Sequence, residues 1–259
     1  MRIGLAQLNV LWEMKKENFI RAEKFIKKAS HKKCEIVVFP EMFNTGFSMN
    51  IPSIAEKKFG ETAKFLAMQA KQNDINIIAG YTVKGLEGKK GLNQGVLYNR
   101  KGKRVATYTK IHSFSFATED QYYTAGTKVV TFDIEELPSS LFICFDLRFP
   151  EIFRRVAKSV QAIFVIANWP STRIEHWEAL LKARAIENQC FVIGVNRTGR
   201  DGNGIHYSGR SKIIGPLGNE ICSAGQKEEL LIGEIVPHEV VEIRQKFPFL
   251  NSMKSTFRT

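Results

Sequence analysis

Short apolar runs rich in β-branched residues recur along the whole chain and alternate with segments of helical period. The runs occupy residues 3–10, 35–40, 75–82, 96–99, 105–109, 129–134, 140–145, 162–168, 191–196, 212–214 and 230–236. Helical spacing marks residues 17–30, 61–72, 150–158 and 171–189. Alternating strands and helices favour parallel pairing, whereas the turn at 100–103 indicates an antiparallel hairpin. The pattern therefore predicts a layered α/β fold with mixed sheets, and no linker or repeat divides the single domain expected over 1–259.

The net charge raises a non-enzymatic alternative, a basic nucleic-acid-binding module. The 259 residues carry a formal net charge of +12, and the densest basic cluster lies between Lys15 and Lys33. There the basic residues alternate with apolar ones at helical spacing, which is typical of the solvated face of an amphipathic helix. We therefore expect no nucleic-acid partner, although a positive field would attract a small anionic substrate.

Targeting signals and metal-ligand spacings are not found in the sequence. No run of eighteen apolar residues occurs, and the N-terminus enters a strand-like segment without the apolar stretch of a signal peptide. The four cysteines are far apart and the five histidines show no ligand spacing. These features predict a cytoplasmic protein with reduced cysteines, no membrane partner and no metal site.

Three residues with catalytic potential follow three different strand-like runs. Cys144 lies where an apolar strand meets a helix start, a position that suits an exposed nucleophile but also a buried structural cysteine. Glu41 follows a buried-looking run and Pro40, where desolvation would favour a proton shuttle. Lys110 ends another strand and offers a fixed positive charge. Active sites of α/β sheets gather at such strand ends, so we expect the three side chains to meet.

In these contexts and in this order, the three residues resemble the Glu-Lys-Cys triad of the nitrilase superfamily of carbon–nitrogen hydrolases. The resemblance spans nearly the whole chain, from segment 4–7 to the final strands. It includes Glu119, in segment 119–126, which is similar to the second glutamate of the family.

The resemblance implies a four-layer α-β-β-α sandwich, without metal or organic cofactor, that dimerises through its outer helices and C-terminal segment. It implies that Cys144 is the nucleophile, Glu41 the general base and then acid, and Lys110 the oxyanion stabiliser. Glu119 would support the triad, and the backbone N–H of Phe145 would be the second oxyanion donor.

The triad alone does not name a substrate, because branches of the superfamily act on nitriles, amides, N-carbamoyl compounds or acyl-enzyme adducts. Other segments are most similar to the bacterial omega-amidases that act on 2-oxoglutaramate, namely 167–173, 176–177, 182–189, 194–199, 207–209 and 244–248. This similarity implies an enzyme that releases ammonia from short dicarboxylic acid monoamides such as 2-oxoglutaramate or 2-oxosuccinamate.

The free carboxylate of such a substrate requires a cation, because an unpaired buried charge is costly. Arg173 is the predicted cation, although a surface role at a helix start stays open. Trp169, Phe43 and Phe116 are predicted as apolar walls.

Arg148 is expected outside the pocket, paired with a carboxylate such as Glu151 or Asp146.

Two enzymatic alternatives remain. The same triad would serve another amide, nitrile or N-carbamoyl substrate. A cysteine–histidine hydrolase, with Cys144 activated by His176 or His206, would leave Glu41 and Lys110 without a role.

Overall fold

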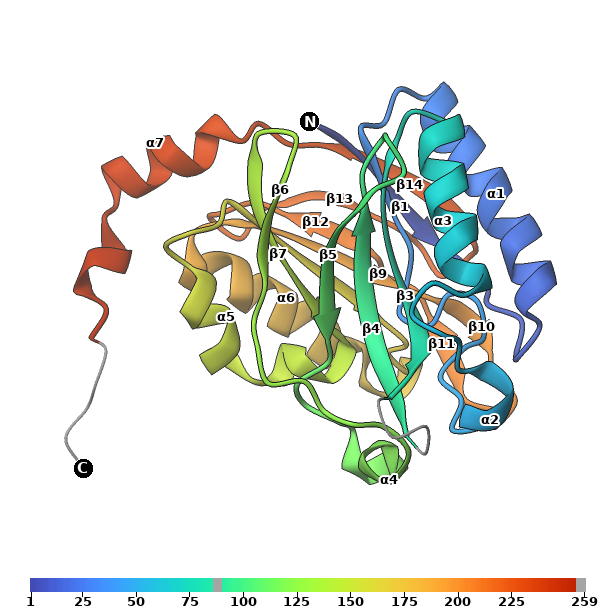
Figure 1. Ribbon diagram of the computed structural model, residues 1–259. Helices are drawn as coiled ribbons and strands as arrows, with labels where there is room; N and C mark the ends of the chain where they lie inside the picture. Colours follow the sequence, from blue (N-terminus) through green and yellow to red (C-terminus); the bar gives the residue numbers. More distant parts are fainter. Residues whose placement is uncertain (86–89, 255–259) are drawn as a thin grey trace.

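Two mixed six-stranded sheets face each other across an apolar core (Figure 1). The computed structural model describes residues 1–85 and 90–254. In the first sheet the order is β14-β1-β2-β3-β4-β5, where β1, β2 and β3 are parallel and the other neighbours antiparallel. These strands are β1 (Arg2–Gln7), β2 (Ile36–Val38), β3 (Asn76–Lys84), β4 (Gly91–Tyr98), β5 (Arg104–Thr109) and β14 (Glu229–Glu234).

The second sheet repeats this arrangement in the order β13-β12-β9-β8-β7-β6, with β7, β8 and β9 parallel at its centre. Its strands are β6 (Thr131–Ile134), β7 (Leu137–Ile143), β8 (Ala162–Ala167), β9 (Phe191–Asn196), β12 (Lys212–Ile214) and β13 (Glu220–Ser223). A separate hairpin pairs β10 (Thr198–Arg200) with β11 (His206–Ser208).

Helices cover the outer face of each sheet. The first sheet is covered by α1 (Lys15–His31) and α3 (Glu61–Gln72), and the second by α5 (Pro150–Val156) and α6 (Ile174–Asn188) (Figure 1). The predicted four-layer α-β-β-α arrangement is therefore confirmed. The remaining helical segments are α2 (Ile51–Ile54), α4 (Glu119–Tyr122), α7 (His238–Lys246) and the 3-10 helices η1 (Ser115–Ala117), η2 (Cys144–Arg148), η3 (Ser171–Arg173) and η4 (Phe249–Ser252).

Alternating side chains of the first sheet enter two different apolar layers. Leu5 and Ile78 face the second sheet, whereas Ala6 and Ile77 face outward and pack beneath α1 and α3. Because both faces of the sheet are buried, its central strands read as continuous apolar runs rather than as alternating patterns.

The structure confirms one predicted hairpin and differs from the sequence prediction at several other elements. The hairpin around 100–103 is the antiparallel pair β4–β5. The helix expected at 171–189 begins instead with a 3-10 turn, η3, before α6. Three short strands, β10, β11 and β13, and the helix α7 were not predicted, because short, partly exposed segments have weak apolar periodicity.

Helix α7 and η4 lie beyond the edge of the two sheets (Figure 1). Within residues 1–85 and 90–254, none of the helices has the length and apolar character needed to cross a membrane.

A pair of glycines allows the two sheets to approach closely. Gly80 on β3 and Gly95 on β4 are cross-strand partners. A Cβ atom on Gly80 would lie 2.8 Å from the Cα of Glu41 and 2.9 Å from the Cδ1 of Ile166, in the opposite sheet. The backbone of Glu41 therefore rests against a position that has no room for a side chain.

We predict that Gly80→Ala lowers the free energy of unfolding by about 1–3 kcal/mol through overpacking and displaces the Glu41 backbone. Urea unfolding measures the first effect. The matched control is Gly225→Ala, at an exposed position where the nearest atom to a new Cβ is 3.7 Å away. Equal stability of the two variants would contradict the prediction.

Candidate active site

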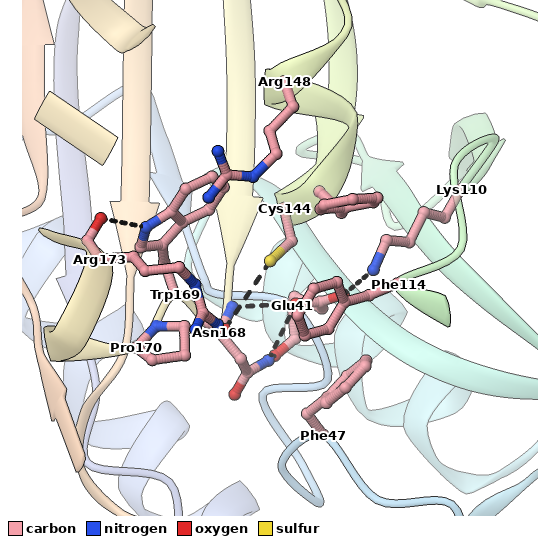
Figure 2. A pocket seen from close by; sticks show the side chains of 11 residues that line it. Glu41, Phe47, Lys110, Phe114, Cys144, Arg148, Asn168, Trp169, Pro170 and Arg173 are labelled. Carbon is pink, nitrogen blue, oxygen red and sulfur yellow. Dashed lines mark hydrogen bonds and ion pairs between the residues drawn. The ribbon is translucent and has the colours of Figure 1, made fainter. Parts of the chain in front are cut away.

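The ends of three strands from both sheets bring together Glu41, Lys110 and Cys144 (Figure 2). Glu41 follows β2 and Lys110 follows β5 in the first sheet, whereas Cys144 follows β7 in the second. All three line one pocket, as their positions at strand ends predicted. The packing of one sheet on the other therefore assembles the site.

The backbone turns sharply at Cys144. Its φ is +49°, in the left-handed region that side chains other than glycine rarely adopt. The turn ends β7 and begins η2, so the thiol projects at the strand end rather than into the core. The thiol donates to the carbonyl oxygen of Asn168 at 3.7 Å. Burial and the nearby Glu41 carboxylate raise the pKa of Cys144 well above its usual value, so the resting sulfur is a neutral thiol.

Four hydrogen bonds hold the fully buried carboxylate of Glu41. Its Oε1 accepts from the Asn93 side-chain amide at 2.7 Å and from the Lys110 ammonium at 3.1 Å. Its Oε2 accepts from the backbone N–H of Asn168 at 2.9 Å and from that residue's side-chain amide at 3.3 Å. These donors fix the orientation of the carboxylate beside the thiol.

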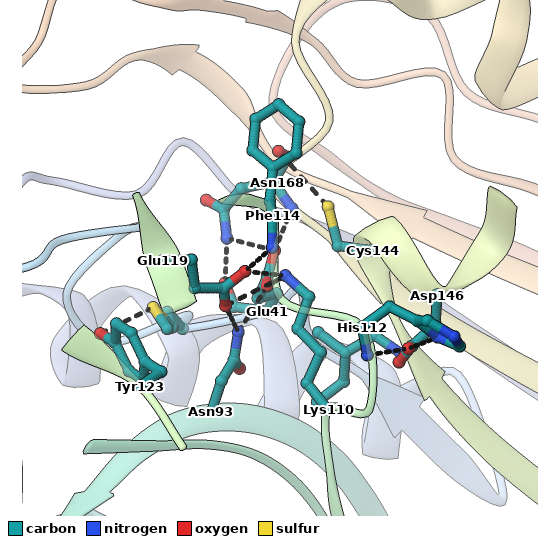
Figure 3. Close-up of polar contacts among 12 residues, drawn as sticks. Glu41, Asn93, Lys110, His112, Phe114, Glu119, Tyr123, Cys144, Asp146 and Asn168 are labelled. Atoms are coloured by element: carbon teal, nitrogen blue, oxygen red, sulfur yellow. Dashed lines mark hydrogen bonds and ion pairs between the residues drawn. The ribbon is translucent and has the colours of Figure 1, made fainter. Parts of the chain in front are cut away.

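The ammonium of Lys110 lies between two carboxylates (Figure 3). It is 3.1 Å from Glu41 and 2.8 Å from Glu119, and all three side chains are buried. Burial alone would lower the pKa of Lys110, but Glu119 and Glu41 raise it above its usual value. Lys110 therefore stays protonated at neutral pH and can donate to an oxyanion but cannot act as a base.

Glu119 is also tied to the pocket wall. Its Oε2 accepts from the backbone N–H of Phe114 at 2.6 Å, and its Oε1 accepts from Asn93 at 3.0 Å. The side-chain amide of Asn93 therefore bridges the carboxylates of Glu119 and Glu41, and the Phe114 backbone also holds Glu119.

The pocket is narrow, with a cavity volume of about 30 Å³, and aromatic side chains form most of its apolar wall. It is lined by Glu41, Phe47, Lys110, Phe114, Cys144, Phe145, Arg148, Asn168, Trp169, Pro170 and Arg173. Trp169 and Arg173 therefore lie where the sequence predicted.

The other two predicted wall residues lie elsewhere. Phe43 is fully buried and packs against Phe19 and Phe39 beneath α1, because the tight turn after β2 directs it to the opposite face of the sheet from the pocket. Phe116 is 86% exposed in η1 and leaves the pocket wall to Phe114.

Two guanidinium groups line the pocket, so the expectation that Arg148 lies outside it was wrong. The guanidinium carbon of Arg148 is 4.9 Å from the Trp169 ring centroid, and one of its nitrogens is 3.1 Å from Nδ1 of His176. The guanidinium of Arg173 is 5.5 Å from the Phe114 ring centroid. Within residues 1–85 and 90–254, neither arginine forms an ion pair with a carboxylate.

Neither Glu151 nor Asp146, the carboxylates predicted to pair with Arg148, forms an ion pair with it among the described residues. Asp146 accepts from Tyr108 and His112 instead. Burial and the neighbouring Arg173 lower the pKa of Arg148, which reflects the proximity of two positive charges.

Two asparagines of the site were not predicted as functional residues. Asn168 follows β8 in the same way that Cys144 follows β7, so its place at a strand end was the available signal. Asn93 lies inside β4, but the strand predicted from the sequence begins at residue 96 and therefore excludes it.

No metal centre is recognisable in the part of the chain that the structure describes. There, no three His, Cys, Asp or Glu side chains are grouped as potential ligands, and the four cysteines are free.

Comparison with known proteins agrees with this geometry. The family model for carbon-nitrogen hydrolases matches residues 2–245. The chain is 33% identical over 254 residues to the 2-oxoglutaramate amidase of Bacillus subtilis (strain 168), covering 97% of each chain. It is 36% identical over 215 residues to the omega-amidase YafV of Escherichia coli (strain K12), covering 83% of this chain and 82% of the relative.

Solved structures support the same assignment. A carbon-nitrogen hydrolase superfamily protein from Xanthomonas campestris, XC1258, which carries an arsenic adduct in its active site, superposes with a TM-score of 0.94 at 29% identity. The match covers 100% of this chain and 99% of that one. The protein therefore belongs to the carbon–nitrogen hydrolase family, and the predicted membership is confirmed. It is an amide-hydrolysing enzyme.

Because the pKa of Cys144 is raised, we predict that the free enzyme contains no Cys144 thiolate at about pH 7. The measurement is the ultraviolet absorbance difference between the wild type and Cys144→Ala over a pH titration. The thiolate signal should appear only on the alkaline side of the usual cysteine range. A Cys144-dependent thiolate at neutral pH would contradict the prediction and would favour a pre-ionised cysteine.

Proposed function

We propose that this enzyme is an omega-amidase, which hydrolyses the terminal amide of a short dicarboxylic acid monoamide. The preferred substrates are 2-oxoglutaramate and 2-oxosuccinamate. The observation that carries the proposal is a small pocket in which the buried Glu41 and Lys110, the half-buried Cys144 and two arginines lie together. The relatives named 2-oxoglutaramate amidase and omega-amidase support it.

In the first half-reaction the neutral thiol must lose its proton as it attacks. The Glu41 carboxylate takes the proton of Cys144, the sulfur bonds to the amide carbon, and the carbonyl electron pair moves to oxygen. Lys110 and the backbone N–H of Phe145 donate to this oxyanion. When the oxyanion collapses, the carbon–nitrogen bond breaks and Glu41 gives its proton to the nitrogen, releasing ammonia.

In the second half-reaction water hydrolyses the thioester. Glu41, ionised again, accepts a proton from the water as its oxygen bonds to the acyl carbon. The second oxyanion uses the same donors. Its collapse breaks the carbon–sulfur bond, and the proton on Glu41 returns to Cys144. Glu119 and Asn93 hold Glu41 and Lys110 in place through both steps.

Substrate orientation follows from where the positive charges lie. The free carboxylate of the substrate would bind Arg173, with Arg148 as a second donor, while the amide reaches Cys144. Trp169 helps to place Arg173, because its indole N–H donates to the Arg173 carbonyl oxygen at 2.7 Å. Charge-assisted hydrogen bonds of this kind select for an anionic substrate.

The nearest alternative is the same chemistry on another amide, a nitrile or an N-carbamoyl compound. One specific observation favours it: the chain is also 34% identical over 251 residues to the deaminated glutathione amidase of Synechocystis sp. (strain PCC 6803 / GT-S). A substrate panel separates the two.

We also propose that the enzyme works in the cytoplasm as a homodimer. Support for a dimer comes from α7 and η4, which extend from the body of the subunit and expose Phe249 (Figure 1). Support for the cytoplasm comes from the four free cysteines among the described residues. No nucleic-acid or membrane partner enters the proposal.

We predict ammonia release from 2-oxoglutaramate and 2-oxosuccinamate by the folded, reduced protein, measured in a panel with neutral amides and nitriles. Cys144→Ala should lower turnover at least about 10³-fold. Mass spectrometry of the quenched wild type should find the acyl group on Cys144. Absence of activity toward both oxo acids, with turnover of another panel member, would replace the substrate assignment.

We predict that Arg173→Gln and Arg148→Gln each lower kcat/KM for 2-oxoglutaramate about 10–100-fold, since each removes a charge-assisted hydrogen bond. Turnover of a neutral primary amide of similar length should change little. Arg155→Gln, at an exposed position outside the pocket, is the control. An equal loss on neutral and anionic amides would contradict this binding mode.

A further inference from the structure

The side chain of Asp146 joins two segments of the active site from beneath. It is fully buried in η2. Its Oδ2 accepts from the hydroxyl of Tyr108 at 2.7 Å and from the backbone N–H of Ile143 at 3.1 Å. Its Oδ1 accepts from the backbone N–H of His112 at 2.9 Å and lies 3.0 Å from the Nδ1 of that ring (Figure 3).

These partners flank the two functional groups that come from opposite sheets. Ile143 directly precedes Cys144, whose backbone is in the strained left-handed region. Tyr108 and His112 lie two residues before and two residues after Lys110. A single carboxylate therefore connects the nucleophile turn to the lysine segment without lining the pocket itself.

The pattern of donors requires a carboxylate rather than an amide of the same size. A backbone N–H donates to each of the two oxygens, and neither N–H can rotate away. An asparagine in either orientation would present its NH₂ group to one of them and leave a buried main-chain donor unpaired. One orientation would loosen the turn at Cys144, and the other would loosen the segment that follows Lys110.

We propose that Asp146 is a positioning residue that fixes Cys144 relative to Lys110, and so sets the geometry of the attacking sulfur and the oxyanion donor. The proposal rests on the proposed roles of Cys144 and Lys110, but not on which amide is the substrate. Small displacements of reacting groups lower turnover steeply, whereas Arg173, the first proposed carboxylate donor, lies in η3, which Asp146 does not contact.

The chain contains a matched control for the Asp146 substitution. Asp201, also buried, accepts from the Tyr207 hydroxyl at 2.8 Å and from the backbone N–H groups of Asn203 at 2.9 Å and Ile205 at 3.0 Å. It lies between β10 and β11 and does not line the pocket. Both N–H groups donate to the same oxygen of Asp201, so an asparagine there would keep them paired. The control is therefore Asp201→Ala, which removes a buried tyrosine contact and two main-chain contacts away from the triad segments.

We expect Asp146→Asn to lower kcat on the order of 10²-fold with KM within about threefold of the wild type. Asp201→Ala should lose at least comparable thermal stability and keep its kcat. A kcat of Asp146→Asn below about one fifth of that of Asp201→Ala supports positioning. A value within fivefold, or a parallel change of kcat and KM, overturns it.

Two further measurements keep the test independent of folding and of substrate. If Asp146→Asn does not fold, Tyr108→Phe is compared with Tyr207→Phe, and kcat should fall more than about twofold only in the first. If the wild type turns over no amide tested, the rate of Cys144 alkylation by iodoacetamide is measured in place of kcat. The same fivefold difference between the two aspartate variants is then the criterion. Failure of the proposed substrate would then leave the result on Asp146 intact, and equal alkylation rates in the two aspartate variants would overturn the proposal.

Discussion

The ion pairs of the Lys110 ammonium with the Glu41 and Glu119 carboxylates are the interaction on which the active site depends. Removing Lys110 would leave two buried carboxylates without a counter-charge, which is far more costly than losing a surface ion pair. The cluster as a whole carries one negative charge in excess. In the proposed mechanism, when Glu41 takes the proton of Cys144, that excess moves to the substrate oxygen beside Lys110, so the site holds the same total charge before and after attack. Catalysis requires charge to move over a short distance, but it does not require new charge to be buried.

This arrangement also explains why, in the proposed mechanism, the single carboxylate of Glu41 suffices as the proton acceptor and donor in both half-reactions. The neutral thiol of Cys144 has no tendency to ionise alone, because burial and Glu41 both oppose a thiolate. In the proposed mechanism, proton transfer is therefore coupled to bond formation, and the proton stays on Glu41 until it is given to the leaving nitrogen. Asn93 and Asn168 hold both oxygens of that carboxylate in position, so it returns to the same geometry for the second half-reaction.

Much of the fold and the triad could be predicted from sequence, because both follow from strong local patterns. Continuous apolar runs mark strands that are buried on both faces, and Glu41, Lys110 and Cys144 each stand where such a run stops. The pocket wall was less predictable, since a one-residue change in direction decides which side of a sheet a side chain faces. Phe43 packs under α1 for that reason, and Phe114 occupies the wall where Phe116 was expected. Arg148 was misplaced because η2, a 3-10 helix, turns its side chain to the pocket rather than to the carboxylates near it in sequence.

The groups proposed for catalysis and those proposed for substrate recognition are electrostatically distinct parts of this pocket. In the catalytic cluster, the Lys110 ammonium is neutralised by the carboxylates of Glu41 and Glu119. The two arginines are only half-buried and, within residues 1–85 and 90–254, have no carboxylate as an ion-pair partner. Aromatic rings of Trp169 and Phe114 support their guanidinium groups without neutralising them. The positive charge of this wall is therefore balanced best by an anionic ligand. Substrate preference can change through the arginines while the buried triad stays the same, which is how one reaction mechanism can serve several different amides.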